Sequence, residues 1–146
     1  MMNAFLNELH MCVTYLCLRL PTGLFVTSFR GHPNVQHVQC TGEALTSDSN
    51  VLLMTLFEHP NDTTVASVNY GNNQCSTSAM FSSCEIDVTN SRKTRVNTLL
   101  VDLPYGEVRV FGCNVTFSRA HGRSGFKTWF LGVNVTGRYW CLSTTV

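Results

Sequence analysis

The chain has 146 residues, which corresponds to one domain with a single core and argues against a two-domain enzyme. Its net charge is +1 and its ten basic residues are scattered without a run, so the sequence lacks the basic footprint of nucleic-acid binding and excludes nucleic acid as a partner. Residue types that favour strands account for 49 residues: Val, Thr, Phe, Tyr, Trp and Ile. The good helix formers Ala, Lys and Glu account for only 12, so the composition predicts an all-β domain.

Residues 1–22 are predicted to be an irregular N-terminal segment. Its apolar stretch, 13–18, follows Glu8 and His10 and has no Lys or Arg before it, so it fits a secretory signal peptide poorly. An amphipathic helix and a truncated start are the alternative interpretations, the helix because apolar residues recur at roughly helical spacing, at Phe5, Leu9, Val13, Leu16 and Leu20. No run of 18 apolar residues occurs, so we expect no membrane span in this chain.

From Gly23 onward, short apolar runs are separated by clusters of Gly, Asn, Asp and Ser, which is typical of a β-sandwich or barrel. We expect seven or eight strands, the first over 23–29 and the second over 34–41. The run 51–59 is continuously apolar, so it is predicted to be buried on both faces or nearly so. Residues 64–70 alternate as a further strand.

The second half begins with a polar stretch over 71–83. Two further strands are expected after it: one in which Cys84, Ile86 and Val88 alternate, and one over 96–103 with Leu99, Val101 and Leu103 on one face.

The segment 107–117 is the most informative, because a period of two places Phe111, Cys113, Val115 and Phe117 on one face. Asn114 is then expected to point the other way. In the last strand the same rule places Asn134 opposite an apolar face formed by Trp129, Leu131, Val133 and Val135.

Three N-x-Thr sequons occur, at Asn61, Asn114 and Asn134, where about two would arise by chance. Two of them have the outward orientation that a glycan requires. Together with seven cysteines, they indicate passage through the secretory pathway and a secreted or cell-surface glycoprotein. No C-x-x-C spacing occurs, which favours disulfides over zinc ligands or a redox motif.

The passage 99–117 resembles the E-to-F strand passage of an immunoglobulin domain, with Glu107 at the acidic position and Phe111 at the Tyr position two residues before Cys113. Val38 and Cys40 resemble the B-strand pair, and 129–135 resembles the closing G strand. The sequence departs from the family at Phe111, which lacks the tyrosine hydroxyl. It also has no Trp in the candidate C strand, where Leu53, Leu56 or Phe57 must fill the space.

The resemblance implies an all-β immunoglobulin-like sandwich of two antiparallel sheets over 23–136, followed by a C-terminal tail over 137–146. A fibronectin-like sandwich or a jelly roll is the alternative. The resemblance also implies an inter-sheet disulfide between Cys40 and Cys113, contributing about 4 kcal/mol, against about 2.7 kcal/mol for a short loop from Cys75 to Cys84. Three cysteines then remain: Cys12, Cys17 and Cys141.

The sequence offers little catalytic chemistry. His32, His37 and Cys40, with His59 or His121, match no standard metal spacing. Neither an activated thiolate, a motif pair of carboxylates nor a phosphate-binding loop is recognisable. We therefore expect a protein that is not an enzyme and that needs no cofactor.

Two groups of residues are candidate binding sites. Phe130 with Tyr139 and Trp140 forms either a contact patch or internal packing against a tail or neighbouring domain. Arg119, His121 and Arg123 lie beside glycines in the expected loop between the F and G strands, which is either a recognition loop or a plain surface turn.

These observations predict an extracellular immunoglobulin-like binding module for protein recognition or cell adhesion. Its partner is expected to be a protein ligand or receptor, or another immunoglobulin-like domain. Cys141 is either an interchain bridge or a chance cysteine near an irregular C-terminus. The alternatives are a secreted structural or coat-type sandwich that acts by assembly, and a small secreted hydrolase.

Overall fold

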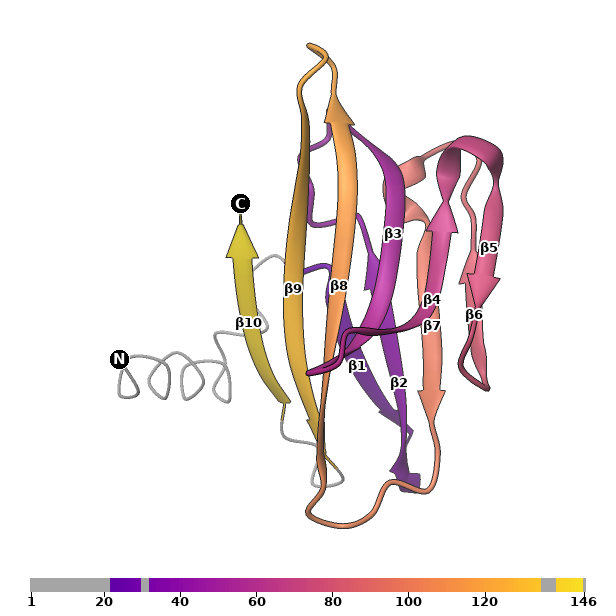
Figure 1. Cartoon of the computed structure of the whole chain (residues 1–146), viewed down its shortest axis with the longest axis vertical. Coiled ribbons are helices and arrows are strands. Elements are labelled where there is room, and N and C mark those ends of the chain that lie inside the picture. Colours follow the sequence, from indigo (N-terminus) through magenta and orange to yellow (C-terminus); the bar gives the residue numbers. More distant parts are fainter. Residues whose placement is uncertain (1–21, 30–31, 135–138, 146) are drawn as a thin grey trace.

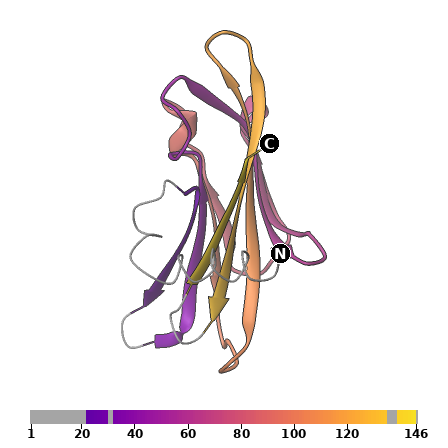
Figure 2. The same cartoon turned by 90° about the vertical axis from the view of Figure 1, so that its left-hand side faces the viewer.

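The computed structural model describes residues 22–29, 32–134 and 139–145, and side chains within them at 22–28 and 35–134. The N-terminal segment expected over 1–22 lies outside this description except for Thr22. Within the described ranges the chain forms two antiparallel sheets packed face to face. Figure 2 shows the two layers edge-on, and Figure 1 looks onto the larger one.

The smaller sheet has four strands in the order β1-β2-β7-β6. Its members are β1 (Leu24–Phe29), β2 (His32–Thr41), β7 (Arg95–Leu100) and β6 (Ser82–Glu85).

The larger sheet has six strands in the order β10-β9-β8-β3-β4-β5. Its members are β10 (Tyr139–Thr145), β9 (Ser124–Asn134), β8 (Val108–Arg119), β3 (Ser49–His59), β4 (Thr63–Asn69) and β5 (Gln74–Thr77). Two short 3-10 turns, η2 (Tyr70–Asn72) and η3 (Ser91–Lys93), lie in connections between strands. Residues 139–145, expected within a tail, pair with β9 as an edge strand.

A disulfide between Cys40 on β2 and Cys113 on β8 joins the sheets through the core, with the two Cα atoms 5.6 Å apart. This confirms the inter-sheet pair implied by the resemblance. In register beside Cys113 lie Leu56 on β3 and Trp129 on β9, both of them buried. Leu56 therefore occupies the place where the immunoglobulin pattern has a C-strand Trp. The largest buried side chain of the core, Trp129, comes from β9 instead.

A second disulfide joins Cys75 on β5 to Cys84 on β6, with the Cα atoms 6.0 Å apart. These strands are edges of different sheets. All four residues of β5 are exposed, so the strand packs little apolar surface of its own. The covalent bond therefore holds a polar edge strand that burial alone would hold weakly.

The alternation predicted for β8 and β9 is confirmed. Phe111, Cys113, Val115 and Phe117 of β8 are all buried, as are Trp129, Leu131 and Val133 of β9. Asn114 is half-buried on the opposite face of β8, as expected. Val135 lies outside the described residues.

The prediction that 51–59 is buried on both faces is wrong. The side chains of Leu52 and Leu53 are 43% and 42% exposed, and only one face of β3 is covered by the other sheet. A continuous apolar run indicates two buried faces in parallel sheets, but this antiparallel sheet leaves one face toward solvent.

Two strand assignments in the second half are also corrected. The strand through Cys84 ends at Glu85, and Val88 is 73% exposed. Leu99, Val101 and Leu103 do not share one face, because β7 ends at Leu100 and its covered face carries the buried residues Val96, Thr98 and Leu100. Asp102 has a φ of 53°, a turn that breaks the alternation before Leu103.

The ten strands within the described ranges exceed the seven or eight expected. The polar stretch over 71–83 contains β5 and the start of β6, which have no apolar alternation. Periodicity cannot detect strands whose side chains are mostly exposed.

Candidate recognition surface

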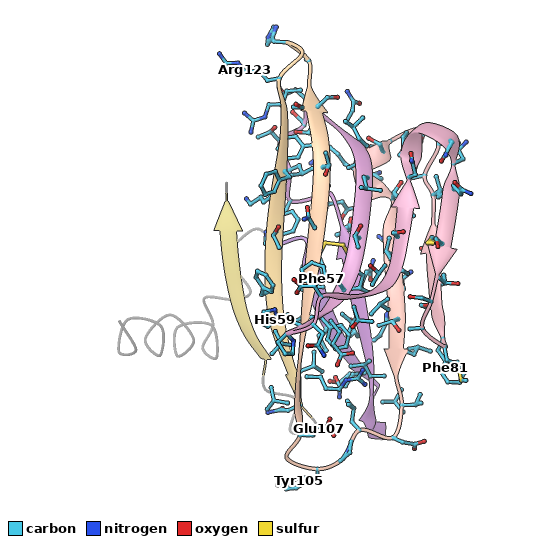
Figure 3. All side chains as sticks on the ribbon, viewed as in Figure 1. Phe57, His59, Phe81, Tyr105, Glu107 and Arg123 are labelled. Carbon is cyan, nitrogen blue, oxygen red and sulfur yellow. A yellow bond between two sulfur atoms is a disulfide. The ribbon has the colours of Figure 1, made fainter. Side chains whose placement is uncertain are left out.

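The turn between β8 and β9 projects beyond the rest of the sandwich at one end (Figure 1). Arg119, His121 and Arg123 are all exposed there, with Arg123 labelled in Figure 3. The turn closes because the Arg119 N–H donates to the Arg123 carbonyl at 2.6 Å and the Gly122 N–H donates to the Arg119 carbonyl at 2.9 Å. Gly122 has a φ of 77°, a conformation that glycine adopts without strain. The predicted loop is thus a hydrogen-bonded hairpin tip with three basic side chains.

The three basic side chains surround one shallow pocket of about 330 Å³, whose fourth lining residue is Asp48. The Thr46 hydroxyl donates to the Asp48 carboxylate at 2.6 Å and holds the pKa of Asp48 below its usual value, with smaller contributions from the charges of Arg119 and His121. Within the described part of the chain, no carboxylate lies within ion-pair distance of either arginine. Their positive charge is therefore available to a partner.

A second shallow pocket of about 290 Å³ continues from this tip onto the sheet. Its apolar lining includes Leu45, Phe117 and Phe126. Arg119 and Lys127 also line this pocket. The Arg119 guanidinium lies 5.6 Å from the ring centre of Phe117, and the Lys127 ammonium lies 5.4 Å from the ring centre of Trp129. The surface combines apolar contact area with positive charge.

The β2–β3 loop beside the tip is held by Arg92 of η3. One guanidinium nitrogen donates to the carbonyls of Glu43 at 3.0 Å and Leu45 at 2.8 Å. The Arg92 carbonyl in turn accepts from the Thr41 hydroxyl at 3.2 Å. A loop fixed in this way loses little conformational entropy when a partner binds.

The connection from β6 to η3 is organised by a carboxylate. Asp87 accepts hydrogen bonds from the backbone N–H groups of Asn90 and Thr89, both at 2.9 Å, and from the Thr89 hydroxyl at 2.8 Å. These bonds, the Asn90 one foremost, lower the pKa of Asp87. The loop therefore depends on the ionised form of this carboxyl group.

Phe130, the other candidate, lies on the outer face of the larger sheet. It is half-buried and packs edge-to-face on Phe57, with ring centres 5.8 Å apart, and against His59 at 5.7 Å. Tyr139 and Trp140 pair through their backbone with β9, and their side chains lie outside the described residues. Sequence reasoning considered His59 only as a metal ligand and Phe57 only as a core residue, and it did not place either beside Phe130. The outward position of residue 57, next to buried Leu56, could have indicated that Phe57 faces outward.

The three sequon asparagines all lie in the larger sheet or its turns. Asn61 is exposed in the β3–β4 turn, Asn114 lies on the outer face of β8, and Asn134 ends β9.

An ion pair that the sequence did not reveal joins β3 and β8 toward the opposite end of the sandwich. Arg109 donates from Nε and Nη2 to the two carboxylate oxygens of Glu58 at 2.8 and 2.7 Å, and its guanidinium lies 5.4 Å from the ring centre of Phe111. The bonds to Glu58 raise the pKa of Arg109. The pair lines an otherwise mainly apolar pocket of about 280 Å³ that includes Phe81 and Leu99.

Among the described residues, no cluster of three or more His, Cys, Asp and Glu side chains is arranged to hold a metal ion. Cys40, which the sequence places near His32 and His37, is bonded to Cys113 and so has no free thiolate. The same described residues form no helix with the length and apolar character needed to cross a membrane.

No family model matches the chain, and no curated protein matches it. Among solved structures, it is similar to murine CRIg, an immunoglobulin-superfamily domain, with a TM-score of 0.50 and 10% sequence identity over 77% of this chain and 98% of that one. The strand orders agree with this likeness: β1-β2-β7-β6 corresponds to the ABED sheet, and β9-β8-β3-β4-β5 corresponds to the GFC sheet extended by C′ and C″. β10 is an additional edge strand beside the strand that corresponds to G. The chain therefore has an immunoglobulin-like fold.

Proposed function

We propose that the chain is an extracellular, non-catalytic binding module that recognises an acidic patch on a protein partner through the β8–β9 tip. The observation that carries this proposal is the cluster of Arg119, His121 and Arg123, exposed on one hydrogen-bonded hairpin. Within the described residues, neither of these two arginines forms an ion pair with a carboxylate. Exposed cations beside apolar contact area are suited to a protein surface, and rim charges accelerate association. The shallow pockets favour a broad macromolecular contact over a small ligand.

The immunoglobulin-like fold supports a recognition role, because the loops at the ends of such sandwiches commonly bind partners. The two disulfides support an oxidising compartment and therefore a secreted or cell-surface location. The partner is a protein ligand or receptor, and another immunoglobulin-like domain is one form that it can take.

The test uses the full chain as a tetramer, applied to an array of purified extracellular ectodomains. The double variant Arg119→Glu/Arg123→Glu reverses the charge of the tip, and Arg95→Glu makes the same kind of change at an exposed position on β7 of the other sheet. We expect at least a tenfold loss of binding for the double variant, and little change for the control. Equal binding by all three proteins would contradict recognition through the tip.

Sedimentation of the untagged chain tests the alternative role of a structural protein that acts by assembly. We expect a species whose mass does not grow with concentration. Concentration-dependent growth into large assemblies would favour the coat-type role.

A further inference from the structure

The outer face of the larger sheet places an acceptor asparagine beside an aromatic side chain. Register puts Phe57, Gly112 and Phe130 in one row across β3, β8 and β9. Asn114 lies in the next row on the same face, opposite Thr55. Because cross-strand and diagonal neighbours on one face lie about 5 to 8 Å apart, the Asn114 amide is within reach of a group that contacts Phe57.

The Phe57 ring is held in place by its neighbours. A Cβ on Gly112 would lie 2.2 Å from Cζ of Phe57, so the ring covers the Gly112 backbone and occupies the space that any other residue would fill. Phe130 packs edge-on against it at an interplanar angle of 87°. Figure 3 shows Phe57 and His59 close together on the larger sheet. The sheet therefore presents an immobilised aromatic surface next to Asn114.

A pocket of about 250 Å³ lies at this surface, and Asn114 is one of its lining residues. The others are Phe57, the hydroxyl-bearing Thr55 and Thr64, and Asp62 from the β3–β4 turn. Asp62 is oriented by His59, whose Nδ1 lies 3.3 Å from Asp62 Oδ1. The pocket thus combines one aromatic side with hydrogen-bonding groups.

A pyranose ring matches this combination. It has C–H faces that can pack on an aromatic ring and a rim of hydroxyl groups that need hydrogen-bond partners. An N-acetylglucosamine residue adds an amide that can both donate and accept. Asn114 starts the sequon Asn-Val-Thr, so such a sugar would be delivered to the pocket by its own covalent bond.

We propose that Asn114 carries an N-linked glycan whose first N-acetylglucosamine packs in this pocket against Phe57. In the transfer, the Asn114 amide nitrogen bonds to the anomeric carbon of a lipid-diphosphate-linked oligosaccharide. The bond from that carbon to the diphosphate oxygen breaks, the lipid diphosphate leaves, and one amide proton is released. The transfer precedes pairing of β8 with β3 and β9, because Asn114 is half-buried between them afterwards.

This inference rests on the passage through the secretory pathway that the proposed function requires. It also assigns a role to the centre of the sheet: the glycan covers the row from Phe57 to Phe130 and leaves the β8–β9 tip free for a partner.

Asn61 provides a matched control. Asn61 is exposed in the β3–β4 turn. Asp62 of its sequon lines the pocket, but Asn61 itself does not. A glycan at Asn61 is expected to extend into solvent without stabilising the fold.

The test directs the full chain into the secretory pathway of cultured cells with an added leader. Peptide mass spectrometry measures the occupancy of each sequon. Two single-sequon proteins are then compared, one retaining Asn114 (Asn61→Gln/Asn134→Gln) and one retaining Asn61 (Asn114→Gln/Asn134→Gln). Each is measured with its full glycan, after enzymatic trimming to one N-acetylglucosamine, and after complete removal, which converts the asparagine to aspartate.

We expect Asn114 to be occupied and trimming to change the Tm of that protein by less than about 1 °C, because the first sugar remains. Complete removal should lower its Tm by about 3 °C. An Asn114→Asp variant made without glycan provides the reference for the converted residue. When Phe57→Leu is added to the protein that retains Asn114, complete removal of the glycan should lower the Tm by less than about 1 °C. Complete removal from the protein that retains Asn61 should have an equally small effect.

Nuclear magnetic resonance provides a direct readout. The ring current of Phe57 should shift proton signals of the first sugar, and Phe57→Leu should abolish the shift. An unoccupied Asn114, or a Tm loss that is the same with and without Phe57, would overturn the inference. Neither result bears on Arg119 and Arg123, so failure here is distinguishable from failure of the proposed function.

Discussion

Gly23 lies against the indole ring of Trp129, so closely that a Cβ on Gly23 would be 2.4 Å from Cζ3 of that ring. The Gly23 carbonyl also accepts a hydrogen bond from the Thr41 N–H at 2.7 Å. Gly23 precedes β1 of one sheet, while Trp129 belongs to β9 of the other. The absence of a side chain at Gly23 therefore lets the two sheets approach each other at the flank where the largest core residue lies.

Gly23→Ala should lower the free energy of unfolding by about 1 to 3 kcal/mol, because the new methyl group must displace either the indole or the backbone of Thr41. Urea unfolding followed by tryptophan fluorescence measures the change. Gly71→Ala is the control, since a Cβ there meets only the Asn69 side chain, at 3.5 Å. Equal losses for the two variants would contradict the packing argument.

The two disulfides should differ in their contribution to stability. Replacing Cys40 and Cys113 together with Ala should remove about 4 kcal/mol, because that bond closes a loop with a sequence separation of 73. Replacing Cys75 and Cys84 together with Ser should remove about 2.7 kcal/mol, because their separation is 9. Chemical unfolding of each double variant tests the order, and a larger loss for the shorter loop would reverse it.

The Glu58–Arg109 pair should show a coupling energy of about 1 kcal/mol in a double-mutant cycle with Glu58→Ala and Arg109→Ala. Two parallel hydrogen bonds strengthen the pair, but about a third of each side chain is exposed and solvent screens the charges. The coupling should shrink in 1 M salt. Independent effects of the two substitutions would show that the pair does not act as a unit.

Asp87 should make stability depend on pH. Its pKa is lowered in the folded state, so its contribution is complete above the unfolded value of about 3.9 and is lost as the pH falls through the folded value. Asp87→Asn should therefore have a lower Tm than the parent at pH 7. The difference should narrow as the pH falls below about 4, as thermal unfolding followed by circular dichroism would reveal. A constant difference over that range would rule out this role for the carboxylate.

Alternation predicted the strands that have one apolar and one polar face. A period of two predicted the inward face of β8 and the burial of Trp129. The disulfide partner of Cys113 could be predicted because the surrounding residues resemble the E-to-F passage of an immunoglobulin domain. These features are local in the sequence, and burial of one face enforces them.

Features that depend on distant neighbours could not be predicted in this way. Alternation predicted that Leu99 and Leu103 share a face, but the left-handed turn at Asp102 interrupts the alternation between them. The pairing of Glu58 with Arg109 depends on the register between β3 and β8, which no local pattern fixes. At the candidate site, the three basic residues of the β8–β9 turn could be identified from the sequence as loop residues. The pocket that they share with Asp48 could not be predicted, because it depends on where the β2–β3 loop lies in space.

The bond between Cys75 and Cys84 has a consequence for self-association. Sheets can grow between molecules only where an edge strand has room for a new neighbour, and β5 and β6 are tied to each other along one flank. A strand from another molecule that approached β5 would meet β6, and one that approached β6 would meet β5, because the two are cross-linked. We therefore expect intermolecular backbone pairing at the opposite flank, where β1 and β10 are the outermost strands among the described residues, and reduction of this bond should open a second route to aggregation.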